Sequence, residues 1–312
     1  MSAKTGLELG IRAPLRAVKK AAKIADAGML DYYFVPETHP KFAGVDALKA
    51  LDGIAAKIEN VILGTAIINV FSRNKKNMLE LARRIYQKVD GRFVLGLGTS
   101  APVIIENIYN VKFEKPIFRI KSYTEYIKNH YRGPVYWAAV GDRVTGSAAK
   151  YADGTIFFLK PEREIKRSIK IIKNELIPQN RKYSQFGIIS IRPTYVDDYE
   201  KNGKNAAKMT IASYVGANEF YSKPLEKAGF KKEVRMIREN FLKQGLTAAA
   251  TQVSDKMVKE LATFGSAKKC AMEINEYADR TKIKTVIAGF DLPKNGYNND
   301  FFKNLHKLTS RL

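Results

Sequence analysis

The sequence contains very little cysteine or histidine, and this scarcity excludes several kinds of site. Its single cysteine, Cys270, excludes an internal disulfide and suits a reducing compartment. The three histidines and this cysteine are not spaced as metal ligands, so we expect no metal site. Neither a Walker loop nor a Ser–His–Asp pattern is present to indicate a hydrolase.

Long apolar runs are also missing. No stretch approaches the roughly 20 apolar residues that a membrane-spanning helix needs, and the first residues lack the apolar core of a secretory signal. We therefore expect a soluble, cytoplasmic protein that does not associate with membranes. With 312 residues, 45% of them hydrophobic, the chain is long enough to form one large core.

Acidic residues are scarce relative to basic ones. The chain has 54 lysines and arginines against 31 aspartates and glutamates, which gives a formal net charge of +23. Such a charge attracts anions, whether nucleic acids, membranes or small molecules. The basic residues are interleaved along helical stretches such as 160–173 and 223–243, which indicates solvated helix faces. We expect an anionic small-molecule partner and no specific nucleic acid, because no nucleic-acid-binding motif appears.

Short apolar segments alternate with helical patterns along most of the chain. Nearly every segment is followed by a helix, which favours an α/β protein with a parallel sheet, and eight units favour a closed (β/α)8 barrel. The expected strands cover residues 7–11, 31–36, 60–70, 91–99, 135–140, 155–159, 187–196 and 283–290.

The connection between the last two expected strands is far longer than the others. The connection between two neighbouring parallel strands needs far fewer residues than the stretch 197–282 contains. Its pattern predicts several extra helices, so we expect one domain over residues 1–312 with a helical insertion at about 197–282. By contrast, residues 101–116 are expected to be irregular.

The segment GRFVLGLGTS at 91–100 combines a buried strand with a glycine-rich end. Gly96 and Gly98 permit a sharp turn and leave no side chain between the backbone and a ligand. Thr99 and Ser100 add hydroxyl groups at the carboxyl end of the strand, where parallel α/β proteins bind ligands. A plain strand followed by a flexible turn explains the same residues.

Several segments together resemble the luciferase-like flavin and deazaflavin oxidoreductases. Their order and spacing are most similar to the coenzyme F420-dependent branch, which includes methylenetetrahydromethanopterin reductase. The matching segments are VPETH (35–39), GTAIINVFSR (64–73), GRFVLGLGTS (91–100), FEKP (113–116), YWAAVG (136–141), YADGT (151–155), VSD (253–255) and FGS (264–266).

This resemblance implies a TIM-like barrel of the bacterial luciferase type and a hydride transfer between reduced F420 and a small organic substrate, including pterin-type substrates. Two alternatives stay open. One is an FMN-dependent luciferase-like monooxygenase, and the other is a non-catalytic barrel that keeps cofactor or polyanion binding. Relatives are often dimers through barrel helices, so the resemblance also implies a homodimer.

The resemblance further implies where the cofactor lies. Its ring would lie over a bulge in the third strand, where relatives carry a non-proline cis peptide and this chain has the bond Ala66–Ile67. A bulge at Gly64 with trans bonds is the alternative. Its phosphate would meet the segment after the fifth strand. The implied cofactor-binding residues are Thr65, Ala66, Ile67, Asn69, Gly96, Gly98, Thr99, Ser100, Ala138, Ala139, Val140 and Gly141.

Asp142 departs from the pattern of these relatives, which often carry proline there. A carboxylate facing a phosphate would repel it. The cofactor could still bind if Asp142 points away and Arg143 compensates its charge.

Catalytic and substrate-binding residues are likewise implied by the resemblance. Glu8 matches an inward carboxylate, and Glu37 and His39 lie where relatives place polar groups near the cofactor. A buried carboxylate with a raised pKa could move a proton, although Glu8 could instead pair with a barrel lysine or arginine, and His39 could be an ordinary surface residue. Arg73 could bind an acidic tail or cap its loop. The expected substrate-binding residues are Arg73, Asn107 and Tyr109.

Overall fold

The computed structural model describes residues 3–39, 44–291 and 296–312. Its strands are β1 (Lys4–Leu9), β2 (Tyr32–Val35), β3 (Ile62–Thr65), β4 (Ile68–Asn69), β5 (Phe93–Gly98), β6 (Val135–Ala138), β7 (Gly154–Phe158), β8 (Gly187–Val196), β9 (Thr263–Gly265) and β10 (Thr285–Phe290). Its α-helices are α1 (Leu15–Ala27), α2 (Ala47–Ile54), α3 (Lys75–Lys88), α4 (Pro102–Tyr109), α5 (Pro116–Lys128), α6 (Asp142–Tyr151), α7 (Glu162–Leu176), α8 (Glu200–Ala217), α9 (Glu219–Leu225), α10 (Lys231–Gln244), α11 (Leu246–Thr251), α12 (Asp255–Leu261), α13 (Ala267–Thr281) and α14 (Asn299–Thr309).

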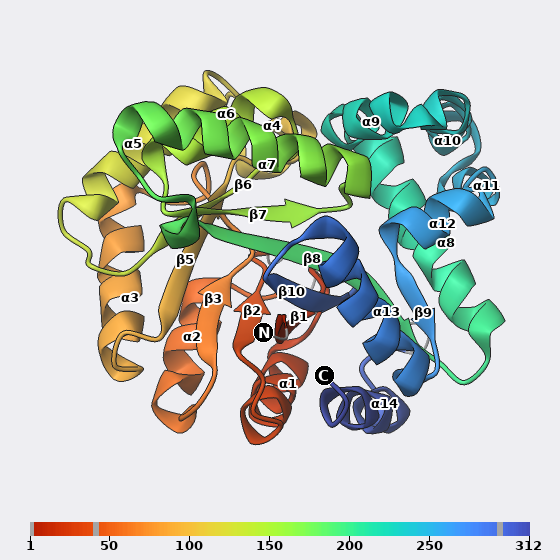
Figure 1. The fold of residues 1–312 in the computed structure, drawn as a ribbon, viewed down its shortest axis with the longest axis horizontal. Helices are drawn as coiled ribbons and strands as arrows, with labels where there is room; N and C mark the ends of the chain where they lie inside the picture. Colours follow the sequence, from red (N-terminus) through yellow and green to blue (C-terminus); the bar gives the residue numbers. More distant parts are fainter. Residues whose placement is uncertain (1–2, 40–43, 292–295) are drawn as a thin grey trace.

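The parallel strands close into a barrel. The sheet runs β10-β1-β2-β3-β5-β6-β7-β8, and the pairing of β10 with β8 closes it. Helices surround the strands, with α1 to α3 on one flank and α5 to α7 on another (Figure 1). The predicted α/β barrel is therefore confirmed. We call the end formed by the carboxyl ends of the strands the barrel mouth.

The inside of the barrel is filled by apolar side chains. Every second residue of a strand faces inward, and the inward positions are mostly branched or aromatic. Burying each such side chain stabilises the fold by about 1.5–3 kcal/mol relative to exposure. This inner core consists of Phe34, Val94, Ile156, Ile189, Ile191 and Ile287.

Two segments differ from the sequence-based expectation. The single strand expected at 60–70 is interrupted, because β3 ends at Thr65 and β4 resumes at Ile68. The segment 101–116 is not irregular throughout, because α4 begins at Pro102, whose fixed φ suits the first position of a helix.

The residues between β8 and β10 form a second apolar core. Helices α8 and α10 to α12 pack on one another and lie together on one side of the molecule (Figure 1). Strand β9 pairs with the end of β8 at Thr194–Val196 and ties these helices to the barrel. Helix α13 also falls within 197–282, but its Cys270, Ile274 and Tyr277 pack into the main barrel core.

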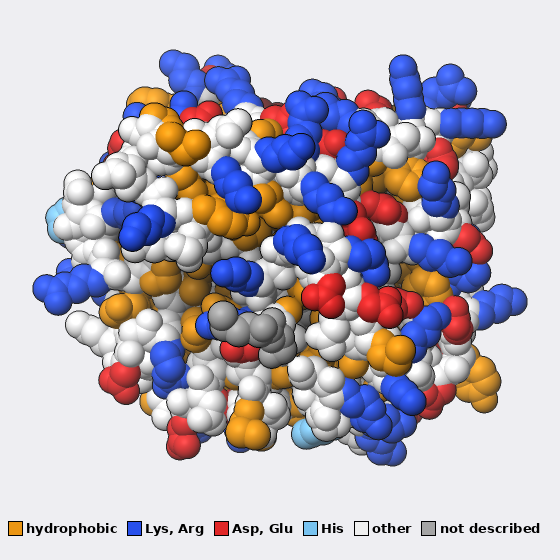
Figure 2. Space-filling view, in the orientation of Figure 1, with side chains coloured by type: hydrophobic (Ala, Val, Ile, Leu, Met, Phe, Trp, Pro, Cys, Tyr) orange, Lys and Arg blue, Asp and Glu red, His pale blue; other side chains and the backbone are white. Residues whose placement is uncertain are grey.

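Basic side chains are distributed widely over the surface. On the face shown in Figure 2, lysines and arginines are spread over most of the surface and do not form a single block. No helix in the described part of the chain is both long and apolar enough to cross a membrane.

Candidate active site at the barrel mouth

The break between β3 and β4 forms a bulge at the barrel mouth. The peptide bond Ala66–Ile67 is cis, as the resemblance implied. The hydroxyl group of Thr65 donates to the carbonyl of Gly96 and accepts from its N–H, both at 2.9 Å. Thr65 is fully buried, so its side chain holds the bulge against β5, while Ala66 and Ile67 are partly exposed.

The glycines of β5 make room for this bulge. A Cβ atom on Gly96 would overlap the carbonyl oxygen of Thr65, and one on Gly98 would lie 2.5 Å from Cδ1 of Ile67. The protein's own bulge fills the space that the missing side chains leave, while contact of these glycines with a ligand stays a prediction. Thr99 and Ser100 follow at the rim, and both are partly exposed.

The segment expected to hold a phosphate leads directly into α6. Gly141 precedes the first helical turn, and a Cβ atom there would meet nothing within 4 Å. The carboxylate of Asp142 pairs with Arg167 at 2.8 Å and with Lys227 at 3.0 Å. The compensating cations are thus Arg167 and Lys227, in place of the expected Arg143, and their charge outweighs that of Asp142.

A buried lysine lies beneath this segment. Lys160 follows β7, where Leu159 turns the chain with a φ of 47°. Its side chain is only 5% exposed, donates to the carbonyl of Ala139 at 3.3 Å and stacks over the Phe157 ring. Burial lowers the pKa of Lys160 to about 7. The assignment of Lys160 to a solvated helix face is wrong.

Glu37 belongs to an ion-paired network beside the bulge. Its carboxylate contacts the guanidinium of Arg73, which also pairs with Asp46 at 3.1 Å. It accepts hydrogen bonds from the backbone N–H of Asn69 at 3.2 Å and from the hydroxyl of Ser72 at 3.1 Å. Burial raises the pKa of Glu37, and the Arg73 guanidinium opposes that rise.

The remaining expected mouth residues are only partly brought together. The rings of His39 and Tyr109 meet edge to face with centroids 5.0 Å apart. Burial, together with the charge of Glu37, raises the pKa of Tyr109 to about 12. Asn107 is exposed on α4 and has no described contact with this group.

Glu8 faces the inside of the barrel. It pairs in register with Phe34 of the inner core and with Gly289 of β10, so its side chain shares their inward orientation. The residue is 6% exposed, and no lysine or arginine among the described residues forms an ion pair with it. Burial, then the negative charge of Asp291, raises the pKa of Glu8 well above its ordinary value. The alternative of a pairing with a barrel cation is not observed.

Aromatic rings from the barrel and from α8 and α9 meet at the mouth. Phe158 at the end of β7 contacts Tyr214 and Tyr221, with centroids 4.9 and 6.1 Å away. On another part of the rim, Phe71 stacks on Phe113 at 5.2 Å. Phe158 also packs against the same inner apolar cluster as Ala66 and Ile67 of the bulge.

Sequence reasoning missed Lys160, Asp291 and the aromatic residues of α8 and α9. The first two could have been found, because each directly follows an apolar strand and so lies at the mouth. The aromatic residues gave no such signal, since their contacts join segments far apart in the chain.

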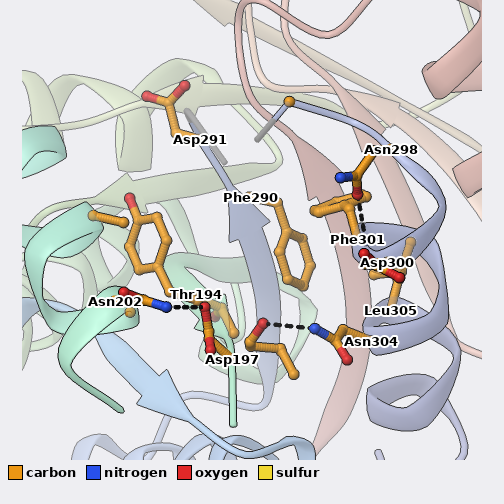
Figure 3. Close-up of a pocket in the computed structure, with 15 residues that line it drawn as sticks. Thr194, Asp197, Asn202, Phe290, Asp291, Asn298, Asp300, Phe301, Asn304 and Leu305 are labelled. Carbon is orange, nitrogen blue, oxygen red and sulfur yellow. Dashed lines mark hydrogen bonds between the residues drawn. The ribbon is translucent and has the colours of Figure 1, made fainter. Parts of the chain in front are cut away.

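A small cavity of about 130 Å³ lies outside this mouth, between β8, β10, α8 and α14. Its polar groups bond to one another: Asn202 donates to Asp197 at 3.1 Å, and Asn304 donates to the Val196 carbonyl at 3.2 Å (Figure 3). Among the described residues, no cluster of three or more acidic, histidine or cysteine side chains could hold a metal.

The fold and these groups define a (β/α)8-barrel protein with a candidate active site at the carboxyl ends of its strands. The model of the luciferase-like monooxygenase family matches residues 2–133 and 128–281. The chain therefore belongs to the luciferase-like monooxygenase family.

Two curated relatives are similar in sequence. A protein named as a coenzyme F420-dependent oxidoreductase from Mycobacterium tuberculosis is 29% identical over 159 residues, which cover 46% of this chain and only 43% of that protein. The 5,10-methylenetetrahydromethanopterin reductase of Methanolobus tindarius is 19% identical over 93% of this chain and 95% of that protein.

Solved structures share the fold. The F420-dependent tetrahydromethanopterin reductase of Methanopyrus kandleri has a TM-score of 0.83 at 16% identity and covers 100% of this chain and 99% of its own. A type II Baeyer–Villiger monooxygenase from Pseudomonas putida, in complex with FMN, has a TM-score of 0.67 at 12% identity and covers 100% and 98%.

Proposed function

We propose that this protein is an oxidoreductase that binds coenzyme F420 across the barrel mouth and transfers a hydride between it and a small organic substrate. The observation that carries the proposal is the buried amino group of Lys160, which donates to the carbonyl of Ala139 in the segment that leads into α6. An ammonium and the free N–H groups of a first helical turn together favour a phosphate. The residues present thus fit the phosphate of such a cofactor.

The surrounding charge favours F420 over FMN. Arg167 and Lys227 lie beside the same helix start and exceed the charge of Asp142, so they can attract an anionic tail beyond the phosphate. One of the curated relatives is named as a coenzyme F420-dependent oxidoreductase, and the solved Methanopyrus kandleri reductase is also described as F420-dependent. FMN is the second candidate, because it also carries a phosphate and a neighbour of the same fold binds it.

The chain's own residues would orient the reactants. Ala66, Ile67 and Asn69 at the bulge would support the ring of the cofactor, with Thr99 and Ser100 at the rim beside them. Glu37 and Arg73 would hold the β4 turn in place, and Glu8 would supply or receive a proton. The cofactor, when bound, supplies the hydride chemistry.

The aromatic walls favour a flat substrate. Phe158, which packs against the same apolar cluster as the bulge, contacts the rings of Tyr214 and Tyr221. The rings of Tyr109 and His39 contact each other. Flat rings pack well between such walls. A pterin-type substrate is therefore the form of substrate that we propose.

Titration with F420, and separately with FMN, tests the proposal. We expect F420 to bind in the micromolar range, as followed by fluorescence quenching, and FMN to bind more weakly. Lys160→Met, which keeps the side-chain length, should weaken F420 binding by about 10- to 100-fold, because a charged hydrogen bond contributes roughly 1.5–3 kcal/mol. Lys166→Met, at an exposed position on α7, is the matched control and should bind normally. Failure of both cofactors to bind would contradict the enzyme assignment.

A further inference from the structure

Two basic side chains pair with one carboxylate at the start of α6. Asp142 is the first residue of that helix. Its Oδ2 atom lies 2.8 Å from Nη2 of Arg167 on α7 and 3.0 Å from Nζ of Lys227, in the segment 226–230 between α9 and α10. A third basic group responds to the same charge, because Asp142 opposes the fall in the pKa of Lys160 that burial causes. Asp142 is therefore the carboxylate on which the cations of this region converge.

The Asp142 carboxylate is ionised at neutral pH and accessible to solvent. Burial would raise its pKa, but the hydrogen bonds and charges of Lys227 and Arg167 lower it below the ordinary value. The side chain of Asp142 is 29% exposed, and those of Arg167 and Lys227 are 56% and 48% exposed. Ion pairs at such exposed positions are weak. An anion from solution can therefore replace the carboxylate beside these two cations.

The start of α6 differs from the start of α12, which carries a similar group of charges. Asp255 is the first residue of α12 and pairs with Lys204 and Lys208 at 2.8 and 2.9 Å. Ser254 caps α12 with a side-chain hydrogen bond of 3.1 Å. By contrast, Gly141 precedes α6 and has no side chain that could cap it, and a Cβ atom there would meet nothing within 4 Å. The first turn of α6 thus offers N–H groups and open space to a ligand.

We propose that Asp142 is a specificity-determining residue, which occupies the cations at the start of α6 until a doubly charged phosphate replaces it. The inference rests on the proposed function and deepens it. A phosphate at the first turn would meet the same Arg167 and Lys227 that Asp142 holds, and the carboxylate would repel it. A dianion gains more from these cations than the single charge of Asp142 does, so the exchange favours the phosphate.

This exchange discriminates against ligands of lower charge. A neutral molecule that resembles the cofactor but lacks its phosphate gains nothing from cations that are already neutralised. A singly charged anion from solution competes poorly with Asp142, because the carboxylate is tethered beside the cations and so has a high effective concentration. Asp142 therefore weakens the binding of every anion but weakens that of singly charged anions the most in relative terms.

Calorimetric titration with inorganic pyrophosphate tests this exchange without any cofactor. Asp142→Asn keeps the shape of the side chain and removes its charge, so pyrophosphate should bind about 3- to 30-fold more tightly, the range for one unit charge nearby at a partly exposed site. Asp142→Glu keeps the charge and should bind pyrophosphate like the unmodified protein. Asp255→Asn is the matched control, because it removes a paired carboxylate from the capped helix α12 and should leave the affinity unchanged.

A second titration separates the charge of Asp142 from a structural role. FMN and riboflavin share one ring system and differ by a phosphate. Asp142→Asn should raise the affinity for FMN and leave the affinity for riboflavin unchanged, whereas a merely structural role would change both in the same way.

The outcomes distinguish this proposal from the proposed function. An unchanged or lower affinity of Asp142→Asn for pyrophosphate, or no pyrophosphate binding to either protein, would overturn the role of Asp142 even if F420 binds. If pyrophosphate binds more tightly to Asp142→Asn but F420 binds to neither protein, the proposed function fails and the role of Asp142 stands.

Discussion

Two carboxyl groups at the barrel mouth are buried to almost the same degree but have opposite neighbours. The side chain of Glu37 is 7% exposed and contacts Arg73, whereas the residue Glu8 as a whole is 6% exposed and its pKa is raised further by the negative charge of Asp291. Burial disfavours the ionised form of both. Burial raises the pKa of both carboxyl groups, but the Arg73 guanidinium opposes the rise at Glu37, whereas the negative charge of Asp291 adds to the rise at Glu8.

This difference leads us to expect different tasks for the two residues. Glu37, with Arg73 and Asp46, fixes the turn after β4 and so the bulge beside it. Glu8 forms no ion pair with a lysine or arginine of the described residues, and its role as a proton carrier stays a prediction. Burial alone therefore does not identify a catalytic acid, and the charge of the neighbouring group must be known.

Removing Arg73 should produce the largest effect. Arg73→Met leaves Glu37 and Asp46 close together without a cation, and losing one partner of a buried pair costs about 3–5 kcal/mol of unfolding free energy. Chemical denaturation measures this loss. Arg84→Met, which breaks an exposed pair with Asp52, is the matched control and should change stability little. An equally small loss of unfolding free energy for Arg73→Met would contradict the claim that Arg73 stabilises the Glu37 carboxylate.

Replacing Glu8 should have a smaller effect of opposite sign. The folded-state pKa of Glu8 is raised above its ordinary value of 4.5. As the pH rises above that value, the unfolded chain releases this proton while the native protein keeps it, so native stability falls. Glu8→Gln should remove this penalty and gain on the order of 1 kcal/mol near neutral pH.

Denaturation of the Glu8→Gln variant and of the unmodified protein at several pH values checks this sign. The stability difference should grow with pH above about 4.5. A difference that is constant across this range would show that Glu8 ionises normally.

Lys160 is a buried cation, and we expect its titration to produce the smallest of these effects, a pH dependence of F420 binding. Its pKa of about 7 means that near-neutral solutions contain both forms. A bound phosphate favours the ammonium, so F420 binding above pH 7 must take up a proton and should weaken by up to about tenfold per pH unit. Titrations at increasing pH measure this slope, which should be lost in Lys160→Met. If the affinity of the unmodified protein for F420 does not depend on pH, Lys160 does not bind the phosphate.

The fold followed largely from the sequence, because the alternation of strands and helices is a local pattern. The end of β3 and the start of β4 did not follow from the sequence. This interruption depends on the Thr65 hydroxyl, which hydrogen-bonds to the backbone of Gly96 on β5. The same limit applied to α4, whose short apolar segment shows no clear helical period.

The candidate site was predictable where strand ends carry polar residues. Glu8, Glu37 and Arg73 were implied by the resemblance to the luciferase-like oxidoreductases, and all three lie in or just after a strand. The charged groups that act on these residues were not predicted. Asp46 meets Arg73, and Asp291 affects Glu8, only in the folded barrel. Lys160 was misassigned, since a lysine at the start of a basic helical stretch resembles any solvated lysine until the preceding strand is placed.

Equilibrium dialysis of the protein against an equimolar mixture of F420 and FMN tests the central claim most directly. We predict that F420 is retained in preference to FMN, and that Lys160→Met reduces its retention whereas Lys166→Met does not. Preferential retention of FMN would contradict the assignment of the cofactor. Retention of neither would contradict the claim that the barrel mouth is a cofactor site.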